Sequence, residues 1–349
     1  SIVDGKSHID PEKCKKCKMC MSACPYGAIV QTTVPCEAAC PVGAISKDET
    51  GYASIDFEKC ISCGRCIASC PFGAVHEKSQ IIDILKQIKD GKKVIAMVAP
   101  SIAGQFNGSI YQIKTAMLKA GFTDVYEVAQ GADITANNEA KEFVERMERG
   151  DKFMTTSCCA GYNQFVKKHL PEIKPYVSDT KTPLYYTAEI VRKEIPDAIT
   201  VFLSPCVAKR AEGHDNENVN YVMSFEELGS LFTARNIKVE DCEETKYVKE
   251  SSKQARNFGL SGGVAESVKK SLRDEEAIKP HVINGLNKDT IKELKKFAKD
   301  GECCEGCNMV EVMCCEGGCI AGNATMNPVR TAKKMIDTLA AQSEDIEKI

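Results

Sequence analysis

The sequence has little that suggests a membrane, a nucleic acid or a nucleotide as its partner. Its longest apolar run, residues 94–100, is far too short to span a lipid bilayer. The 46 Lys and Arg residues are interspersed with 49 Asp and Glu residues, so we expect no basic face for nucleic acid. No Gly-x-Gly-x-x-Gly turn or phosphate loop opens a predicted helix, which argues against a bound nicotinamide or nucleotide.

Histidine is also scarce. The five histidines form no pair at the spacing of metal ligands, so we interpret all of them as surface or cap residues. Residues 1–10 contain no basic-then-apolar signal segment, and we therefore expect a cytoplasmic protein.

Cysteine, in contrast, is abundant, with 20 in a chain of 349 residues. So many cysteines would form a disulfide framework in a short secreted chain, but in a long chain from a reducing compartment they indicate metal binding. Half of them lie between Cys14 and Cys70, where residues 9–14 are closely repeated as residues 55–60. The repetition predicts a duplicated cysteine-rich unit.

Beyond this unit, helical patterns alternate with short apolar runs. The runs are residues 94–100, 124–129, 153–157 and 199–205. Helices are predicted over residues 80–92, 133–149 and 329–341. The alternation predicts an α/β domain, so we expect two domains, residues 1–79 and 80–349.

The cysteine-rich unit contains two runs of the form Cys-x-x-Cys-x-x-Cys-x-x-x-Cys-Pro, which is typical of bacterial ferredoxins. Zinc domains also use Cys-x-x-Cys, but they rarely need two four-cysteine runs with prolines in register. We therefore predict an α+β ferredoxin-like head with two 4Fe-4S clusters and crossed ligation. One cluster is assigned Cys14, Cys17, Cys20 and Cys70, and the other Cys60, Cys63, Cys66 and Cys24.

An insertion between the two runs leaves one ligand open. Cys36 and Cys40 lie in this insertion, and the residues around Cys40 repeat those around Cys24. Cys40 is therefore an alternative to Cys24 as the last ligand of the second cluster. We prefer Cys24, because the insertion separates two otherwise complete repeats.

Four more cysteines follow strand-like runs in the α/β domain: Cys159, Cys206, Cys315 and Cys319. Strand ends are where α/β folds place their sites, and four thiolates from three converging loops would hold one more 4Fe-4S cluster.

The segments around these cysteines resemble the signatures of iron-iron hydrogenases. Those signatures read approximately Thr-Ser-Cys-Cys-Pro, Met-Pro-Cys-x-x-Lys-x-x-Glu and Glu-x-Met-x-Cys-x-x-Gly-Cys, and residues 156–160, 204–212 and 311–319 match them in the same order. Residues 259–266 look like a further element of the family. The resemblance implies an α/β H-cluster domain and reversible conversion of two protons and two electrons to H₂. In the H-cluster, Cys319 would bridge the cubane to a two-iron subsite with CO, cyanide and azadithiolate ligands.

The resemblance also implies roles for residues around the cluster. Cys158 would carry protons, and Glu139, Ser178 and Glu142 would relay them toward solvent, with Arg146 near the exit. Lys209 would pair with a cyanide ligand, with Glu212 beside it. Met313, Ser204, Pro100 and Ser101 would line the two-iron site.

The sequence departs from the common family pattern at several positions. Ala160 replaces a proline and Ser204 replaces a methionine, which is similar to the less studied group B of the family. Cys303, Cys304, Cys307 and Cys314 are additional thiols, which we interpret as buried or redox-active rather than as ligands. We consider that they protect the open iron site.

The resemblance implies a ferredoxin or flavodoxin as the electron partner and maturation proteins that deliver the two-iron subsite. Two alternatives use the same cluster-binding scaffold. One is an iron-sulfur assembly or adaptor protein, and the other is a hydrogen sensor with slow turnover.

Overall fold

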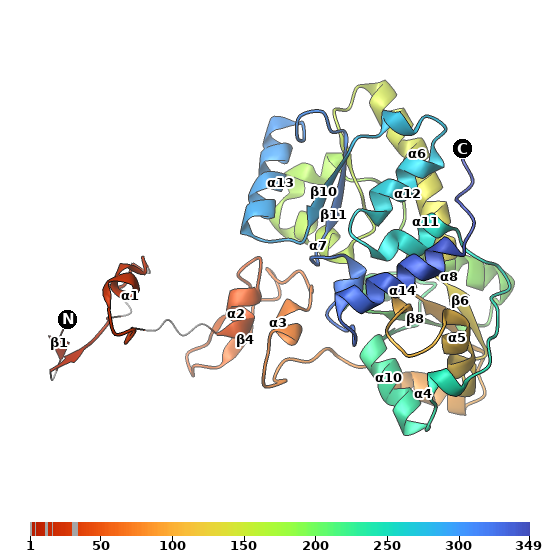
Figure 1. Cartoon of the computed structure of the whole chain (residues 1–349), viewed down its shortest axis with the longest axis horizontal. Coiled ribbons are helices and arrows are strands. Elements are labelled where there is room, and N and C mark those ends of the chain that lie inside the picture. The colour runs from red at the N-terminus through yellow and green to blue at the C-terminus, as the bar shows by residue number, and fades with distance from the viewer. Residues whose placement is uncertain (1, 4, 11–12, 16, 30–33) are drawn as a thin grey trace.

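The computed structural model describes residues 2–3, 5–10, 13–15, 17–29 and 34–349. Figure 1 shows an N-terminal arm, a small cysteine-rich unit beside the main body, and the body itself. The arm contains β1 (Ile2–Val3), antiparallel to β2 (Lys6–Ser7), and α1 (Met19–Ala23).

The small unit is built from residues 34–75. Strands β3 (Ile45–Lys47) and β4 (Ala53–Ile55) form an antiparallel hairpin. Helix α2 (Pro35–Ala39) precedes the hairpin, and α3 (Arg65–Ala68) follows it and packs against α2. This helix–hairpin–helix arrangement confirms a ferredoxin-type unit, although its first helix comes from the insertion.

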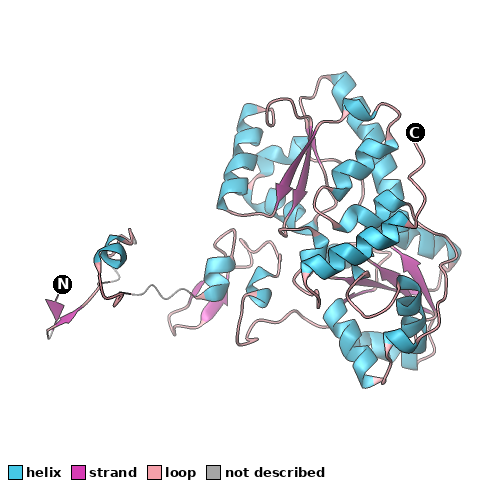
Figure 2. Cartoon of the chain, viewed as in Figure 1, coloured by secondary structure: helices cyan, strands magenta, loops and turns pink. Residues whose placement is uncertain are grey.

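The body contains two parallel sheets, visible as two groups of strands enclosed by helices in Figure 2. The first sheet has the order β6-β5-β8-β9. Its strands are β5 (Val94–Val98), β6 (Asp124–Glu127), β8 (Ile199–Ser204) and β9 (Tyr221–Ser224). Every residue of β5 is buried, because helices cover both faces of a parallel sheet. The covering helices are α4 (Ile81–Lys89), α5 (Ile110–Lys119), α8 (Pro183–Glu194) and α10 (Phe225–Ala234).

The second sheet has the order β10-β11-β7, again parallel. Its strands are β7 (Met154–Thr155), β10 (Pro280–Asn284) and β11 (Met309–Met313). Around it lie α6 (Ala129–Arg149), α7 (Ala160–His169), α12 (Gly263–Ser271) and α13 (Lys288–Asp300). Shorter helices α9 (Lys209–His214) and α11 (Lys253–Arg256) and the last helix, α14 (Val329–Ala341), complete the body. The α/β architecture predicted from the alternating pattern is confirmed.

Helix α6 is the main departure from the predicted elements. It begins at Ala129, four residues before the predicted start, and ends as predicted at Gly150, whose φ is 96°. A Cβ atom at Gly131 would lie 2.1 Å from the Pro183 carbonyl oxygen of α8. The first turn of α6 therefore forms through close packing on α8, which the amphipathic pattern does not reveal. Among the described residues, no helix is long and apolar enough to cross a bilayer.

Candidate active site

Three loops bring four cysteines together at the carboxyl ends of strands from both sheets. Cys159 follows β7 and stands at the N-terminus of α7. Cys206 follows β8, while Cys315 and Cys319 follow β11. All four line one small cavity of about 30 Å³. The structure thus brings together the four cysteines that the sequence grouped.

The backbone around this cavity is packed too closely for side chains at two glycines. Gly318 has φ 85°, and a Cβ atom there would lie 2.6 Å from the Ser261 nitrogen. At Gly322 it would lie 2.6 Å from the Pro205 carbonyl oxygen. The loops after β8 and β11 and the loop at residues 259–261 therefore hold one another rigidly. Four thiols in so fixed a cradle fit the donor set of a 4Fe-4S cubane.

Lys209 extends from the start of α9 toward the same site. Its Nζ atom donates to the Cys158 carbonyl oxygen at 3.1 Å and contacts Glu212 Oε2 at 2.5 Å. Thr182 donates to the other oxygen of Glu212 at 2.5 Å. Burial lowers the pKa of Lys209, but Glu212 outweighs burial and the net shift is upward. Lys209 is thus a positive charge held beside the cysteines.

The residues predicted to surround a two-iron group have different environments. Met313 is buried and lines the cavity with the cysteines. The Ser204 hydroxyl accepts a hydrogen bond from the Cys206 nitrogen at 3.1 Å, so it fixes the loop. Pro100 and Ser101 lie in the short helix after β5, and the fully buried Ser101 hydroxyl has no hydrogen-bond partner among the described residues. A buried hydroxyl without a partner is suited to form a hydrogen bond to a polar ligand bound at this site.

Cys158 and Glu139 form the inner part of a buried chain of polar groups. The Glu139 side chain is fully buried, and its Oε1 atom accepts bonds from the Ser157 nitrogen at 3.2 Å and hydroxyl at 3.3 Å. Its other oxygen has no partner among the described groups. Burial raises the pKa of Glu139 to about 7. Burial is the largest cause that raises the pKa of Cys158 well above its usual range, and the nearby charge of Glu139 is the next largest.

Glu142 forms the outer part of the chain. Ser178 donates to its Oε2 atom at 2.6 Å, and Thr180 donates to the same oxygen at 2.8 Å. The Arg146 Nε atom donates to Oε1 at 2.8 Å. Burial raises the pKa of Glu142, but these donors outweigh it and the net shift is downward. The Ser178 hydroxyl also lowers the pKa of Glu139, so it lies between the two carboxyl groups.

Arg146 is the outermost member of this chain and is itself buried. It donates to the carbonyl oxygens of Pro175 at 2.7 Å and Val177 at 3.0 Å. It also contacts Asp179 at 3.3 Å, whose side chain is 78% exposed. The structure therefore places Glu139, Ser178, Glu142 and Arg146 next to one another, with Cys158 close to Glu139. Ser157 and Thr180 were missed, because Ser157 reaches Glu139 and Thr180 reaches Glu142 only through tertiary contacts with α6.

The cysteine-rich unit touches the site directly. Arg65 donates to the Cys314 carbonyl oxygen at 2.9 Å, and Asn323 donates to the Cys63 carbonyl oxygen. A hydrogen bond from the Cys314 thiol lowers the pKa of Cys63 to about 6. Cys63 lines the same cavity as the four cysteines. Cys314 thus links the two cysteine groups, a role that sequence spacing did not indicate.

The structure does not bring Cys24 to the second ferredoxin run. Cys24 caps α1, which lies in the projecting arm well apart from α2 and α3 in Figure 1. Cys40 instead follows α2 within the same unit as Cys60. It accepts a bond from the nitrogen four residues later at 3.2 Å, just as Cys70 does at 3.3 Å. The preference for Cys24 over Cys40 therefore does not match this arrangement.

Three of the additional thiols are far from the site. Cys303, Cys304 and Cys307 precede β11, whereas Cys315 follows it, so the length of the strand separates them. Five residues of β-strand span about 13 Å. This separation gives no support to the idea that these three thiols protect the iron site, which stays a prediction, whereas Cys314 lies beside the cluster cysteines.

Residues 92–323 match the conserved domain described as "Iron only hydrogenase large subunit, C-terminal domain". The chain belongs to this family. Residues 7–30 match a 4Fe-4S binding domain, and residues 30–81 match the LdpA Fe-S cluster-binding domain. The second match begins after α1 and covers the unit that contains Cys40. The chain is therefore an [FeFe] hydrogenase-like protein with iron-sulfur domains.

Similar proteins include the periplasmic [Fe] hydrogenase large subunit of Nitratidesulfovibrio vulgaris, with 28% identity over 70% of this chain and 72% of that protein. Iron hydrogenase 1 of Clostridium pasteurianum is 29% identical over 74% of this chain, which spans about half (55%) of that protein. The cytosolic Fe-S cluster assembly factor NAR1 of Meyerozyma guilliermondii is 26% identical over 39% of this chain and 29% of that protein.

Among solved structures, a variant of [FeFe]-hydrogenase HydA1 from Chlamydomonas reinhardtii shares the fold with a TM-score of 0.60. The match covers 77% of this chain and 90% of that chain at 19% identity. This likeness confirms the α/β fold of the iron hydrogenase type.

Proposed function

We propose that this chain is an iron-iron hydrogenase that catalyses the reversible conversion of two protons and two electrons to H₂. The observation that carries the proposal is the row of polar groups from Cys158 through Glu139, Ser178 and Glu142 to Arg146, which pairs with the exposed Asp179. Burying the Glu139 carboxyl group costs free energy that its bonds from Ser157 offset only in part, since its Oε2 atom has no partner among the described groups. Proton delivery to a reaction centre is a function that would account for such a group.

In this proposal, Cys159, Cys206, Cys315 and Cys319 would hold the cubane of an H-cluster, and Cys319 would also be the protein's thiolate for the two-iron subsite. That subsite, when bound, supplies the site at which hydrogen is formed or split. Cys158 holds a proton beside it, since burial keeps its thiol neutral. Glu139 exchanges that proton, and its pKa of about 7 allows it to be protonated or ionised near neutral pH.

Lys209, Met313, Ser204, Pro100 and Ser101 are proposed to shape the pocket for the two-iron subsite. Lys209 supplies a buried positive charge for an anionic ligand such as cyanide, with Glu212 fixing its direction. The unpartnered Ser101 hydroxyl supplies a hydrogen-bond donor. Ser204 is proposed to hold the loop of Cys206 in place rather than to contact the two-iron subsite directly.

Electrons are proposed to enter from a ferredoxin or flavodoxin through the clusters of the N-terminal part. The contact between Cys63 and Cys314 supports transfer from the second cluster to the H-cluster cubane. We propose Cys60, Cys63, Cys66 and Cys40 as the ligands of this second cluster. Cys14, Cys17 and Cys20 remain ligands of the first, with Cys24 or Cys70 as the fourth.

Relatives named as assembly factors raise a second candidate, a protein that holds clusters without turnover. Such a protein would have no use for a continuous chain of proton-exchanging groups or for Lys209 beside the cysteines. These features favour the hydrogenase, and the replacements at Ala160 and Ser204 favour its group B. The two-iron subsite would come from maturation proteins.

The test is expression of the full chain with the maturation proteins, followed by infrared spectroscopy and an activity assay. We expect carbonyl and cyanide stretching bands and H₂ evolution with a reduced dye. A chain that has its full iron content but shows neither bands nor H₂ would leave the cluster-holding alternative in place and overturn the hydrogenase.

A further inference from the structure

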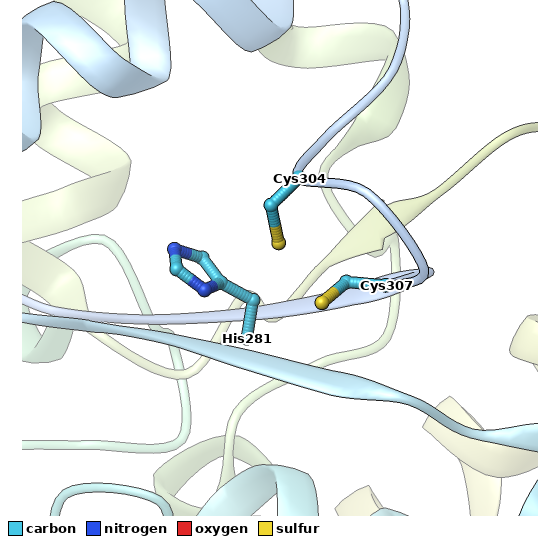
Figure 3. A group of neighbouring side chains, drawn as sticks. All are labelled: His281, Cys304 and Cys307. Carbon is cyan, nitrogen blue, oxygen red and sulfur yellow. The ribbon is translucent and has the colours of Figure 1, made fainter.

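A second group of potential metal ligands lies at the opposite end of the β10-β11-β7 sheet. His281 lies on β10, while Cys304 and Cys307 lie in the loop between α13 and β11. Figure 3 shows the two thiols directed into the same space, with the His281 side chain beside them. One possible ligand atom from each lies within 4.8 Å of those of the other two, and all three residues are half-buried.

The loop is shaped to present both thiols on one side. Cys304 and Cys307 have Cys-x-x-Cys spacing, and Gly306 between them has φ 75°, which permits a tight turn. The Cys307 nitrogen donates to the Cys304 carbonyl oxygen at 3.1 Å, closing the turn. Two thiols on one such turn are the usual half of a zinc site.

The loop is also fixed to the strand that carries the histidine. The Asn308 amide donates to the Ala277 carbonyl oxygen at 2.8 Å and accepts from the Lys279 nitrogen at 2.8 Å. The backbone of Asn308 then bonds to Lys279 at 3.0 Å, where β10 and β11 begin to pair. The approach of the thiols to His281 is thus determined by the backbone.

The histidine ring is held in a defined orientation. Its Nε2 atom lies 2.8 Å from Glu293 Oε1, and the ring meets Phe297 edge-on at 5.9 Å between centroids. A carboxylate only accepts, so Nε2 is the donor to Glu293 and Nδ1 is the ring nitrogen left for a metal. A carboxylate on one ring nitrogen and a metal on the other is the usual arrangement of a ligating histidine.

We propose that His281, Cys304 and Cys307 bind a Zn²⁺ ion. Two thiolates and one neutral imidazole balance its charge, and tetrahedral zinc accepts this mixture of sulfur and nitrogen. The fourth position goes to the neighbouring Cys303 thiol, which already donates to the Cys307 carbonyl oxygen at 3.0 Å, or to water. The site lies a strand length from the cluster cysteines, so its role is structural: it fastens the start of β11, whose far end carries Cys315.

The experiment is zinc K-edge X-ray absorption on the full chain, purified anaerobically with its clusters reconstituted. Absorption at the zinc K-edge comes from zinc, so the iron of the clusters does not contribute to it. We expect one zinc per chain with sulfur at about 2.3 Å and nitrogen at about 2.0–2.1 Å. A Cys304→Ser/Cys307→Ser variant should lose the zinc and retain all of its iron. Cys242→Ser is the matched control, because that buried thiol belongs to the other sheet and should change neither metal.

Two further variants separate a ligand role from a folding defect. Glu293→Gln keeps the size of its side chain and should weaken zinc binding roughly 10- to 100-fold in a chelator competition. Cys303→Ser identifies the fourth ligand. The number of sulfur neighbours of zinc should fall by one if the Cys303 thiol binds and should stay the same if water does. The proposal is overturned if the wild-type chain contains no zinc. It is also overturned if the double variant keeps its zinc, or if the double variant loses iron and not zinc. None of these readings depends on hydrogen turnover.

Discussion

Replacing Glu139 with glutamine tests the proton relay most directly. The amide keeps an oxygen that can accept from Ser157, so the local packing is preserved while the exchangeable proton is lost. With a pKa of about 7, the native carboxyl is protonated and ionised in similar amounts at neutral pH. At its ordinary value of 4.5, protonation at pH 7 would cost about 3 kcal/mol, roughly a 300-fold loss of the protonated form.

We therefore expect Glu139→Gln to lower the rate of H₂ evolution by about 100-fold or more, within the range of general acid–base catalysis. Gas chromatography with a reduced dye measures the rate, and carbonyl and cyanide infrared bands report that the cofactor is loaded. Glu145→Gln, on the exposed side of the same helix, is the matched control and should have no effect. A fully loaded Glu139→Gln variant with more than a third of the native rate would refute the relay.

The same substitution has an effect on stability that is independent of turnover. The folded pKa of Glu139 lies above its unfolded value, so the native chain binds the extra proton and loses stability as pH rises from about 4.5 through 7. The full loss is about 3 kcal/mol. The glutamine variant has no such loss. Its free energy of unfolding, compared with wild type, should therefore increase over this pH interval, as denaturant titrations can measure.

Three further predictions concern other parts of the site. Lys209→Met should retain 4Fe-4S content but lose carbonyl and cyanide bands, because the buried positive charge for an anionic ligand is gone. Arg146→Met should raise the pKa of Glu142 and slow H₂ evolution about 10-fold, with iron content unchanged; an unaltered pH profile would count against it. Cys40→Ser should remove the paramagnetic signal of the second reduced cluster, whereas Cys24→Ser should leave it; the reverse result would restore Cys24 as the ligand.

Much of the site could be predicted because its residues follow recognisable local patterns. The apolar run at β5 indicated an α/β domain. The cysteines after β7, β8 and β11 indicated that the site lies at the ends of strands. Glu139, Glu142 and Arg146 lie at positions i, i+3 and i+7, which put them on one face of α6 without any tertiary information.

What the sequence did not reveal depends on contacts between distant segments. His281 has no metal-ligand partner nearby in sequence, because Cys304 and Cys307 reach it only through the pairing of β10 with β11. The choice of Cys40 depends on the packing of α2 against α3, which is a tertiary contact. The predicted domain boundary at residue 79 and the assignment to group B stay predictions.

The proposed relay lies mainly on a helix, whereas the cluster cysteines lie in loops at strand ends. The cysteines lie on strand ends, where tight loops fix their positions. The proposed relay instead follows one face of α6, where seven residues advance about 10 Å from the fully buried Glu139 to Arg146, whose partner Asp179 is exposed. The pKa of Glu142 is lowered while that of Glu139 is raised to about 7, so inward proton transfer between them runs downhill. The fold therefore favours delivery of protons to the buried end of the chain, and changes at the outer end should alter proton supply while leaving the cluster site intact.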